Sequence, residues 1–223
     1  MGRQRFLIVG EGPQDIGRKA HPAANDAVDY QGAVAELTLS CLHEAGGIPR
    51  EAIQLDTSTI RNLRLHAGGW TRKVSAWMTQ AQQDSYDALF IVIDRDGDKT
   101  RIQEMRLGRE RSEETIPTAL GCAVETLEAW LLGDGEQLCE CLGIRRDDIP
   151  SRPESLDGPP GSKSHPKTFL HSLLAHIEAK GIIYQEIAKR TRIGILCRTC
   201  PEGFGMYKKE IDLVLKSLHP TIS

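Results

Sequence analysis

The sequence of 223 residues lacks several features that would assign it to a large class of proteins. No apolar run approaches the roughly 18 residues that a membrane-spanning helix needs. The N-terminal apolar run is too short for a secretory signal. There is also no strongly basic run, no internal repeat and no phosphate-binding P-loop motif. We therefore expect a cytoplasmic protein that does not enter a membrane and has no ATPase motor of its own.

Six cysteines occur without a secretion signal, which favours reduced thiols over a disulfide framework. Two pairs, Cys139-x-Cys141 and Cys197-x-x-Cys200, offer four thiolates that could bind zinc together. Structural zinc sites usually have about two to four residues within each pair, and the first pair has one. Ordinary buried thiols are therefore the favoured interpretation, and a zinc site is the alternative.

The composition, with 39% hydrophobic and 26% charged residues, is typical of a globular protein. The net charge of -3 is unevenly distributed. Between Lys163 and Lys216 there are ten Lys and Arg against five Asp and Glu, a balance of +5, which leaves -8 for the rest of the chain. This portion could follow a phosphate backbone, although a solvated surface is the simpler interpretation.

The most informative stretch is the apolar run from Ala88 to Ile93, which is followed by Asp94, Asp96 and Asp98. Such a run is typical of a strand that is buried on both faces of a parallel sheet. Three carboxylates so close together repel one another unless a cation lies among them, and hard oxygen ligands suit Mg2+, Mn2+ or Ca2+. The alternative is a solvated turn, because Asp and Gly are common turn residues.

A second run with the same kind of ending lies near the N-terminus. Residues Arg5–Gly10 predict a buried strand, and glycines flank the next residue, Glu11, so that the backbone can turn tightly there. Ligands bind at the carboxyl ends of the strands in open parallel sheets. We therefore expect Glu11 to lie near Asp94 and Asp96 at one edge of a sheet, whereas an exposed turn residue is the alternative and would be the simpler interpretation of Glu11 taken alone.

The remaining pattern predicts an α/β domain over residues 1–150, a Pro/Gly-rich linker over 151–166 and a helical C-terminal appendage over 167–223. Further strands are expected at Ala52–Leu55 and Ala119–Val124. Helices are expected at Ala33–Ala45, Thr71–Gln83, Arg101–Glu114, Glu125–Leu132, Thr168–Lys180, Ile183–Arg190 and Gly205–Leu218. We expect Trp77 to belong to the core.

Two further groups are candidates for binding. Basic residues around Gly68-Gly69, among them Arg72 and Lys73, could hold phosphates through charge and exposed amides, whereas a surface loop is the alternative. Glu125 and Glu128 are three residues apart and are expected to share a helix face. They could add carboxylates to the metal cluster or simply favour the positive end of the helix.

A buried strand ending in Glu11-Gly12 and a later one ending in Asp94-Arg95-Asp96 together resemble the Toprim fold of topoisomerases, primases and overcoming-lysogenization-defect nucleases. The resemblance covers roughly residues 5–132. More narrowly, residues 124–132 with His165-Pro166-Lys167 and Cys200-Pro201-x-x-Phe204 are similar to a family of small bacterial Toprim-like proteins of undefined function, some found beside phage-defence genes. We therefore expect an α/β, Toprim-like (Rossmann-like) fold, with a mostly parallel four-stranded sheet flanked by helices and a C-terminal helical appendage.

This resemblance implies metal-dependent cleavage of phosphodiester bonds in DNA or RNA. Asp94 and Asp96 would hold Mg2+ or Mn2+, with Asp98 as a further candidate ligand. Glu11 would act as general acid or base, or complete the metal shell. Lys163 and Lys167 are candidates for stabilising charge on the substrate.

Three hypotheses remain open. The first is a nuclease, as a candidate component of phage defence, with a partner protein supplying any ATPase. The second is a non-catalytic Toprim-like subunit that binds nucleic acid or metal, or acts as a sensor, within a multiprotein complex. The third and weakest is a small phosphatase or nucleotide-processing enzyme. Strand passage is not expected, because none of the four tyrosines lies in a recognisable nucleophile setting.

Overall fold

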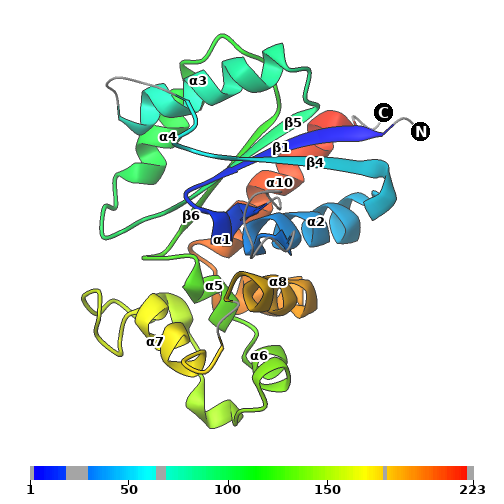
Figure 1. The fold of residues 1–223 in the computed structure, drawn as a ribbon. Helices are drawn as coiled ribbons and strands as arrows, with labels where there is room; N and C mark the ends of the chain where they lie inside the picture. Colours follow the sequence, from blue (N-terminus) through cyan, green and yellow to red (C-terminus); the bar gives the residue numbers. More distant parts are fainter. Residues whose placement is uncertain (1–2, 19–29, 64–68, 178–179, 220–223) are drawn as a thin grey trace, which may run out of the picture.

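The computed structural model describes residues 3–18, 30–63, 69–177 and 180–219. At its centre lies a sheet of four parallel strands in the order β4-β1-β5-β6 (Figure 1). The strands are β1 (Gln4–Gly10), β4 (Ile53–Thr59), β5 (Ala88–Asp94) and β6 (Thr118–Ala123). The expected α/β class, with a four-stranded parallel sheet flanked by helices, is confirmed.

The strand order places the ends of β1 and β5 side by side. Val9 of β1 pairs with Ile91 of β5, and both strands run in the same direction. The strand that follows β1 in this sheet, β4, lies on one side of β1, and the next strand, β5, lies on its other side. The crevice at such a reversal of strand order is where open α/β sheets bind ligands. Residues just after β1 and β5 therefore lie at a favourable place for a site.

Helices cover both faces of the sheet, with α3 and α4 on one face and α2 and α10 on the other (Figure 1). Helices α5, α6, α7 and α8 lie below the sheet in this view, and α8 packs on α2. The helices are α1 (Pro13–Ile16), α2 (Ala33–Gly46), α3 (Trp70–Gln83), α4 (Arg101–Glu110), α5 (Glu128–Leu132), α6 (Gly135–Leu142), α7 (Pro166–Leu173), α8 (Lys180–Arg190), α9 (Ile193–Thr199) and α10 (Phe204–Leu218). Short 3-10 turns are η1 (Arg50–Ala52), η2 (Arg146–Asp148) and η3 (Pro153–Ser155), and a small antiparallel pair joins β2 (Gly17–Arg18) to β3 (Tyr30–Gln31).

The alternation of side chains along the strands divides the core into two clusters. Leu7 and Val9 point toward α3 and α4, where they pack with Trp77, which is 4% exposed as expected for a core residue. Phe6 and Ile8 point to the opposite face and join the larger cluster. The central strands β1 and β5 are thus buried on both sides, which explains why they contain continuous apolar runs, whereas the edge strand β4 carries polar residues and is half-buried after Ile53.

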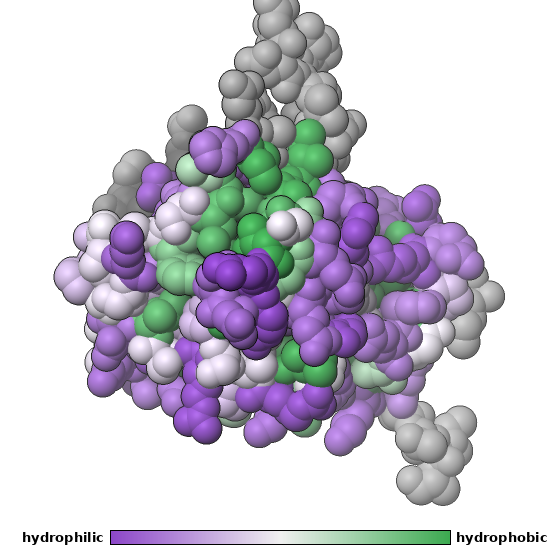
Figure 2. Space-filling model, turned by 90° about the horizontal axis from the view of Figure 1, so that it is seen from below, coloured by the Kyte–Doolittle hydropathy of each residue, from purple (hydrophilic) through white to green (hydrophobic). Residues whose placement is uncertain are grey.

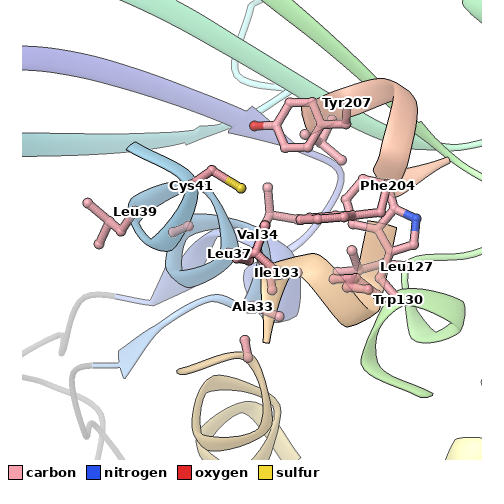
Figure 3. Close-up of a cluster of buried hydrophobic side chains, with 14 of the residues drawn as sticks. Ala33, Val34, Leu37, Leu39, Cys41, Leu127, Trp130, Ile193, Phe204 and Tyr207 are labelled. Atoms are coloured by element: carbon pink, nitrogen blue, oxygen red, sulfur yellow. The ribbon is translucent and has the colours of Figure 1, made fainter. Parts of the chain in front are cut away.

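The larger cluster extends from the sheet into the C-terminal helices (Figure 3). The Trp130 ring stacks on Tyr207 with the ring centroids 5.7 Å apart, and Phe204 meets Trp130 edge-on at 5.3 Å. A Cβ atom at Gly121 of β6 would come within 2.8 Å of the Tyr207 ring, so the glycine allows α10 to lie directly on the strand. The division into residues 1–150, 151–166 and 167–223 stays a prediction.

Several expected elements differ from the observed ones at their ends. Strand β4 continues to Thr59, and the helix expected over Thr168–Lys180 is α7, which ends at Leu173. The expectation that Glu125 and Glu128 share a helix face is wrong. Glu125 has a φ of 57° and lies in the bend before α5, which begins only at Glu128.

The face seen from below in Figure 2, where α6, α7 and α8 lie, has an apolar patch bordered by hydrophilic side chains. Partly exposed apolar residues of this region, such as Leu142, Phe169 and Leu173, pack against the larger cluster. Among the described residues, no helix is both long enough and apolar enough to cross a bilayer.

Candidate active site

The turn after β1 brings two acids to the carboxyl edge of the sheet. Glu11 follows Gly10, and the short helix α1 then places Asp15 beside it, with Asp15 Oδ2 accepting a hydrogen bond of 2.9 Å from Gly12 N. A Cβ atom at Gly10 would come within 2.5 Å of the Ile16 side chain. This tight turn therefore depends on glycine.

The end of β5 presents Asp94 to the same crevice. Asp94 Oδ1 accepts a hydrogen bond of 2.8 Å from the backbone amide of Leu127, which fixes the carboxylate toward the start of α5. Glu128, the first residue of α5, has a side chain that is only 5% exposed. Two strand ends and one helix start thus contribute carboxylates to one region.

Four carboxylates, those of Glu11, Asp15, Asp94 and Glu128, interact electrostatically in this region. Burial raises the pKa of Asp94 well above its usual value, and the charges of the other three acids raise it further. Burial, and then the charges of Glu128 and Glu11, raise the pKa of Asp15 to about 6, against the opposing effect of the hydrogen bond from Gly12. Such clusters of acids favour a nearby cation.

Burial also raises the pKa of Glu11, and so does the charge of Asp96. Arg101 partly opposes this effect. Its Nη1 lies 3.9 Å from Glu11 Oε1 and 2.8 Å from Asp96 Oδ2, and it donates a hydrogen bond of 2.7 Å to the Asp94 carbonyl. Arg101 therefore ties the acidic loop after β5 to the first turn of α4.

Of the two later aspartates of the loop, Asp98 lies outside the cluster and Asp96 lies at its exposed edge. The side chains of Asp96 and Asp98 are 49% and 47% exposed, and both face Arg101. Asp98 Oδ1 accepts hydrogen bonds from the backbone and hydroxyl of Thr100, which lower the pKa of Asp98. Asp98 therefore behaves as a turn residue, and Asp96 lies at the edge of the site beside Glu11.

The two glutamates near α5 have different surroundings. Glu125 forms an ion pair of 2.6 Å with Arg95, so its carboxylate is engaged away from the cluster. Glu128 Oε1 accepts a hydrogen bond of 3.2 Å from the Tyr184 hydroxyl and lies 4.0 Å from Lys167 Nζ. Of these two glutamates, only Glu128 lies in the cluster of acids with Glu11 and Asp94.

A hydrogen-bonded chain extends from Glu128 into α8 and α7. Tyr184 donates its only hydroxyl proton to Glu128, so the contact of 3.1 Å between Tyr184 and His171 Nε2 requires the ring nitrogen to be the donor. Burial raises the pKa of Tyr184 above its ordinary range, and burial lowers the pKa of His171. The neutral tautomer of His171 with its proton on Nε2 satisfies this chain.

The expected substrate-binding cations have different positions. Lys167 lies at the cluster, whereas Lys163 is exposed in the loop before α7. Lys73 lies over the Trp70 ring, 4.2 Å from its centroid, and Arg72 is exposed on the same helix, α3. The glycine pair expected to expose amides to phosphate falls partly on residues 64–68, which lie outside the described residues.

The oxygen donors at the cluster suit Mg2+ or Mn2+ chemically. No group of three or more His, Cys, Asp or Glu is arranged to hold a metal ion within the described ranges. Mg2+ usually keeps several waters and is bound by one or two carboxylates together with substrate phosphates. The donor set therefore fits such an ion, with Asp94 and Glu11 as the residues that would hold it and Asp15 beside them.

In the described part of the chain, the four cysteines of the two pairs form no such group either. Cys200 is buried and its Sγ lies 3.4 Å from the Ala129 carbonyl, which accepts its hydrogen bond. Burial raises the pKa of Cys200 and of Cys141. Their surroundings favour the interpretation as ordinary thiols.

Sequence reasoning missed Asp15, Arg101 and Tyr184. Asp15 had a weak local signal, because it follows Glu11 by four residues and one turn of helix brings such positions together. Tyr184 had none, since it reaches Glu128 only through the packing of α8 against α5.

A scan against protein-family models gave no match to this chain, and neither did searches of curated proteins and of solved structures. The Toprim resemblance therefore stays a prediction from the residues that carry it.

Proposed function

We propose that this chain is a nuclease that hydrolyses phosphodiester bonds of DNA or RNA with the help of Mg2+ or Mn2+. The main support is the gathering of Glu11, Asp15, Asp94 and Glu128 where a parallel sheet binds ligands. Keeping several carboxylates together in a partly buried place costs stability unless a cation neutralises them. A fold that keeps them there is best explained by a site that binds a cation.

The resemblance of Glu11-Gly12 and Asp94-Arg95-Asp96 to Toprim motifs supports the same reaction. It also extends the proposal to a role in phage defence, in which a partner protein supplies any ATPase activity. The bound metal would polarise a phosphate oxygen and favour deprotonation of a water.

The residues of the chain would have separate roles in this reaction. Glu11, whose pKa is raised, would either complete the metal shell or, as the alternative role, accept a proton from the attacking water and return one to the leaving oxygen. Lys167, which is 48% exposed, would attract a substrate phosphate while remaining near Glu128. Arg101 would hold the loop that carries Asp94 and Asp96 in position.

A second candidate function is a non-catalytic subunit that binds nucleic acid or a metal within a complex. Arg101 favours it, because this cation already lies beside Glu11 and Asp96 and compensates part of their charge. A site of this kind needs a divalent ion less than one without an arginine.

The test is incubation of the purified chain with supercoiled plasmid, single-stranded DNA and RNA, each with Mg2+, Mn2+ or EDTA. The matched variants are Asp94→Asn, which keeps an oxygen that can accept from Leu127, and Asp147→Asn, an exposed aspartate in η2. We expect metal-dependent cleavage that falls by at least about a hundredfold in Asp94→Asn and is unchanged in Asp147→Asn.

Equal cleavage by wild type and Asp94→Asn, or none by either, would reject the nuclease. Calorimetric titration with Mn2+ and with nucleic acid then tests whether the chain is a non-catalytic binding subunit. Metal or nucleic-acid binding without turnover, lost in Asp94→Asn, would favour the non-catalytic subunit.

A further inference from the structure

A pocket of about 290 Å³ lies beside the candidate site, at the outer edge of β6 and between α4 and α10. Its lining includes apolar side chains such as Ile102, Met206 and Tyr207. It also includes three cations, Arg95, Lys99 and Arg106, and one acid, Glu202. A volume near the lower end of the range for small-molecule sites fits a ligand of about the size of one nucleotide.

The cations of this pocket have unused capacity for an anion. Lys99 is exposed and Arg106 is half-buried, and neither forms an ion pair or side-chain hydrogen bond with the described residues. Arg95 uses one terminal nitrogen for Glu125, but its buried Nε has no partner in the described part of the chain. Guanidinium and ammonium groups placed in this way favour a phosphate.

The edge of β6 adds main-chain groups to the same pocket. The Arg95 amide donates to the Ala123 carbonyl, and in a parallel ladder alternate residues of a strand face the same neighbour. The amides and carbonyls of Leu120 and Cys122 therefore face away from β5, toward the outer edge. Both residues line the pocket, so main-chain donors and acceptors that have no partner within the described ranges lie beside its apolar side chains.

The lining of the pocket is linked to the candidate active site along the chain. Arg95 is the residue next to Asp94, and its partner Glu125 lies in the bend that leads to Glu128. The residue that follows Asp94 therefore lines the pocket, which places the pocket next to the end of β5.

We propose that this pocket binds one nucleoside phosphate of a nucleic-acid strand, next to the phosphodiester that is cleaved at Glu11 and Asp94. The inference rests on the proposed function and names where its substrate extends. Lys99 and Arg106 pair with the phosphate, the base lies on the apolar lining, and its polar edge meets the free main-chain groups of β6.

The test measures binding of a fluorescein-labelled single-stranded oligonucleotide by anisotropy, in EDTA so that metal-dependent cleavage does not interfere. The variants are Lys99→Gln and Arg106→Gln, with Lys216→Gln on α10 as an exposed control. We expect each pocket variant to weaken binding about tenfold and to reduce the salt dependence of log K by about 0.7. Lys216→Gln should bind as the wild type does.

Binding by Lys99→Gln and Arg106→Gln within about twofold of wild type, at an unchanged salt slope, would overturn the inference. Because Lys99 is exposed, its substitution tests the pocket without disturbing the core. Competition with a mononucleotide and with inorganic phosphate separates the sources of the phosphate. If the mononucleotide or inorganic phosphate displaces the labelled oligonucleotide at a concentration similar to that of unlabelled oligonucleotide, the assignment to a nucleic-acid strand is overturned.

The two proposals can fail separately. Normal cleavage with unchanged binding in the pocket variants would remove the pocket and keep the nuclease. Weakened binding in those variants, with no cleavage by wild type in Mg2+ or Mn2+, would support the pocket and remove only the nuclease.

Discussion

Removing the charge of Asp15 should stabilise the metal-free protein. Its pKa is raised from 3.8 to about 6, mainly by burial and then by the charges of Glu128 and Glu11. At 1.36 kcal/mol for each pKa unit, the ionised carboxylate costs about 3 kcal/mol of folding free energy. Asp15→Asn keeps an oxygen that can accept from Gly12 N. At pH 7.5 in EDTA we therefore expect its melting temperature to rise by roughly 6–12 °C.

The gain should depend on pH in a defined direction. Because the pKa of Asp15 is higher in the folded state than in the unfolded state, the folded protein binds more protons between about pH 4 and 6. The wild type therefore recovers stability as the pH falls through 6, and the advantage of Asp15→Asn disappears near pH 4. Urea unfolding at a series of pH values measures both curves.

The stabilisation that each protein gains from added Mg2+ or Mn2+ tests the same reasoning in a second way. A cation held by Glu11 and Asp94, with Asp15 beside it, should stabilise the wild type more than Asp15→Asn, because the variant has one negative charge fewer near the ion. Asp147→Asn, with an exposed side chain, is the control. If Asp15→Asn is no more stable than wild type in EDTA at pH 7.5, or its gain persists unchanged at pH 4, the electrostatic reasoning is refuted.

Three further predictions concern packing and buried hydrogen bonds. Gly121→Ala should destabilise the fold by about 1–3 kcal/mol, because its Cβ would lie 2.8 Å from the Tyr207 ring. An unchanged midpoint of urea unfolding would contradict the packing of α10 on β6. Tyr207→Phe should lower the free energy of unfolding by about 1 kcal/mol, since Thr38 loses a hydrogen bond of 2.8 Å but keeps its bond to a backbone carbonyl. A loss above about 3 kcal/mol in urea unfolding would show that the Tyr207 hydroxyl has another role. Tyr184→Phe should lower the free energy of unfolding by about 1–3 kcal/mol at neutral pH, because the buried Glu128 carboxylate loses a hydrogen-bond donor. If the thermal melts of Tyr184→Phe and wild type coincide, another group satisfies Glu128.

Local sequence predicted β1 and β5 well because each contains a continuous apolar run, and a strand buried on both faces needs one. Strand β4 was predicted only over its first residues, because its second half, Asp56–Thr59, is polar and half-buried. The start of α5 was harder to predict. The helix-prone composition of residues 125–132 suggested a helix from Glu125, but that residue forms a bend and pairs with Arg95. An ion pair with a side chain 30 residues away has no local signal.

The sequence alone determined that acids end two buried strands, so that Glu11 and Asp94 had to share an edge once the strands were parallel neighbours. Only the tertiary structure decided which other groups join them. Helix packing brings Glu128 into the cluster with Lys167 and Tyr184, and the turn after β5 directs Asp98 away from it. Strand patterns arise from neighbours along the chain, whereas the membership of a site depends on distances between residues far apart in it.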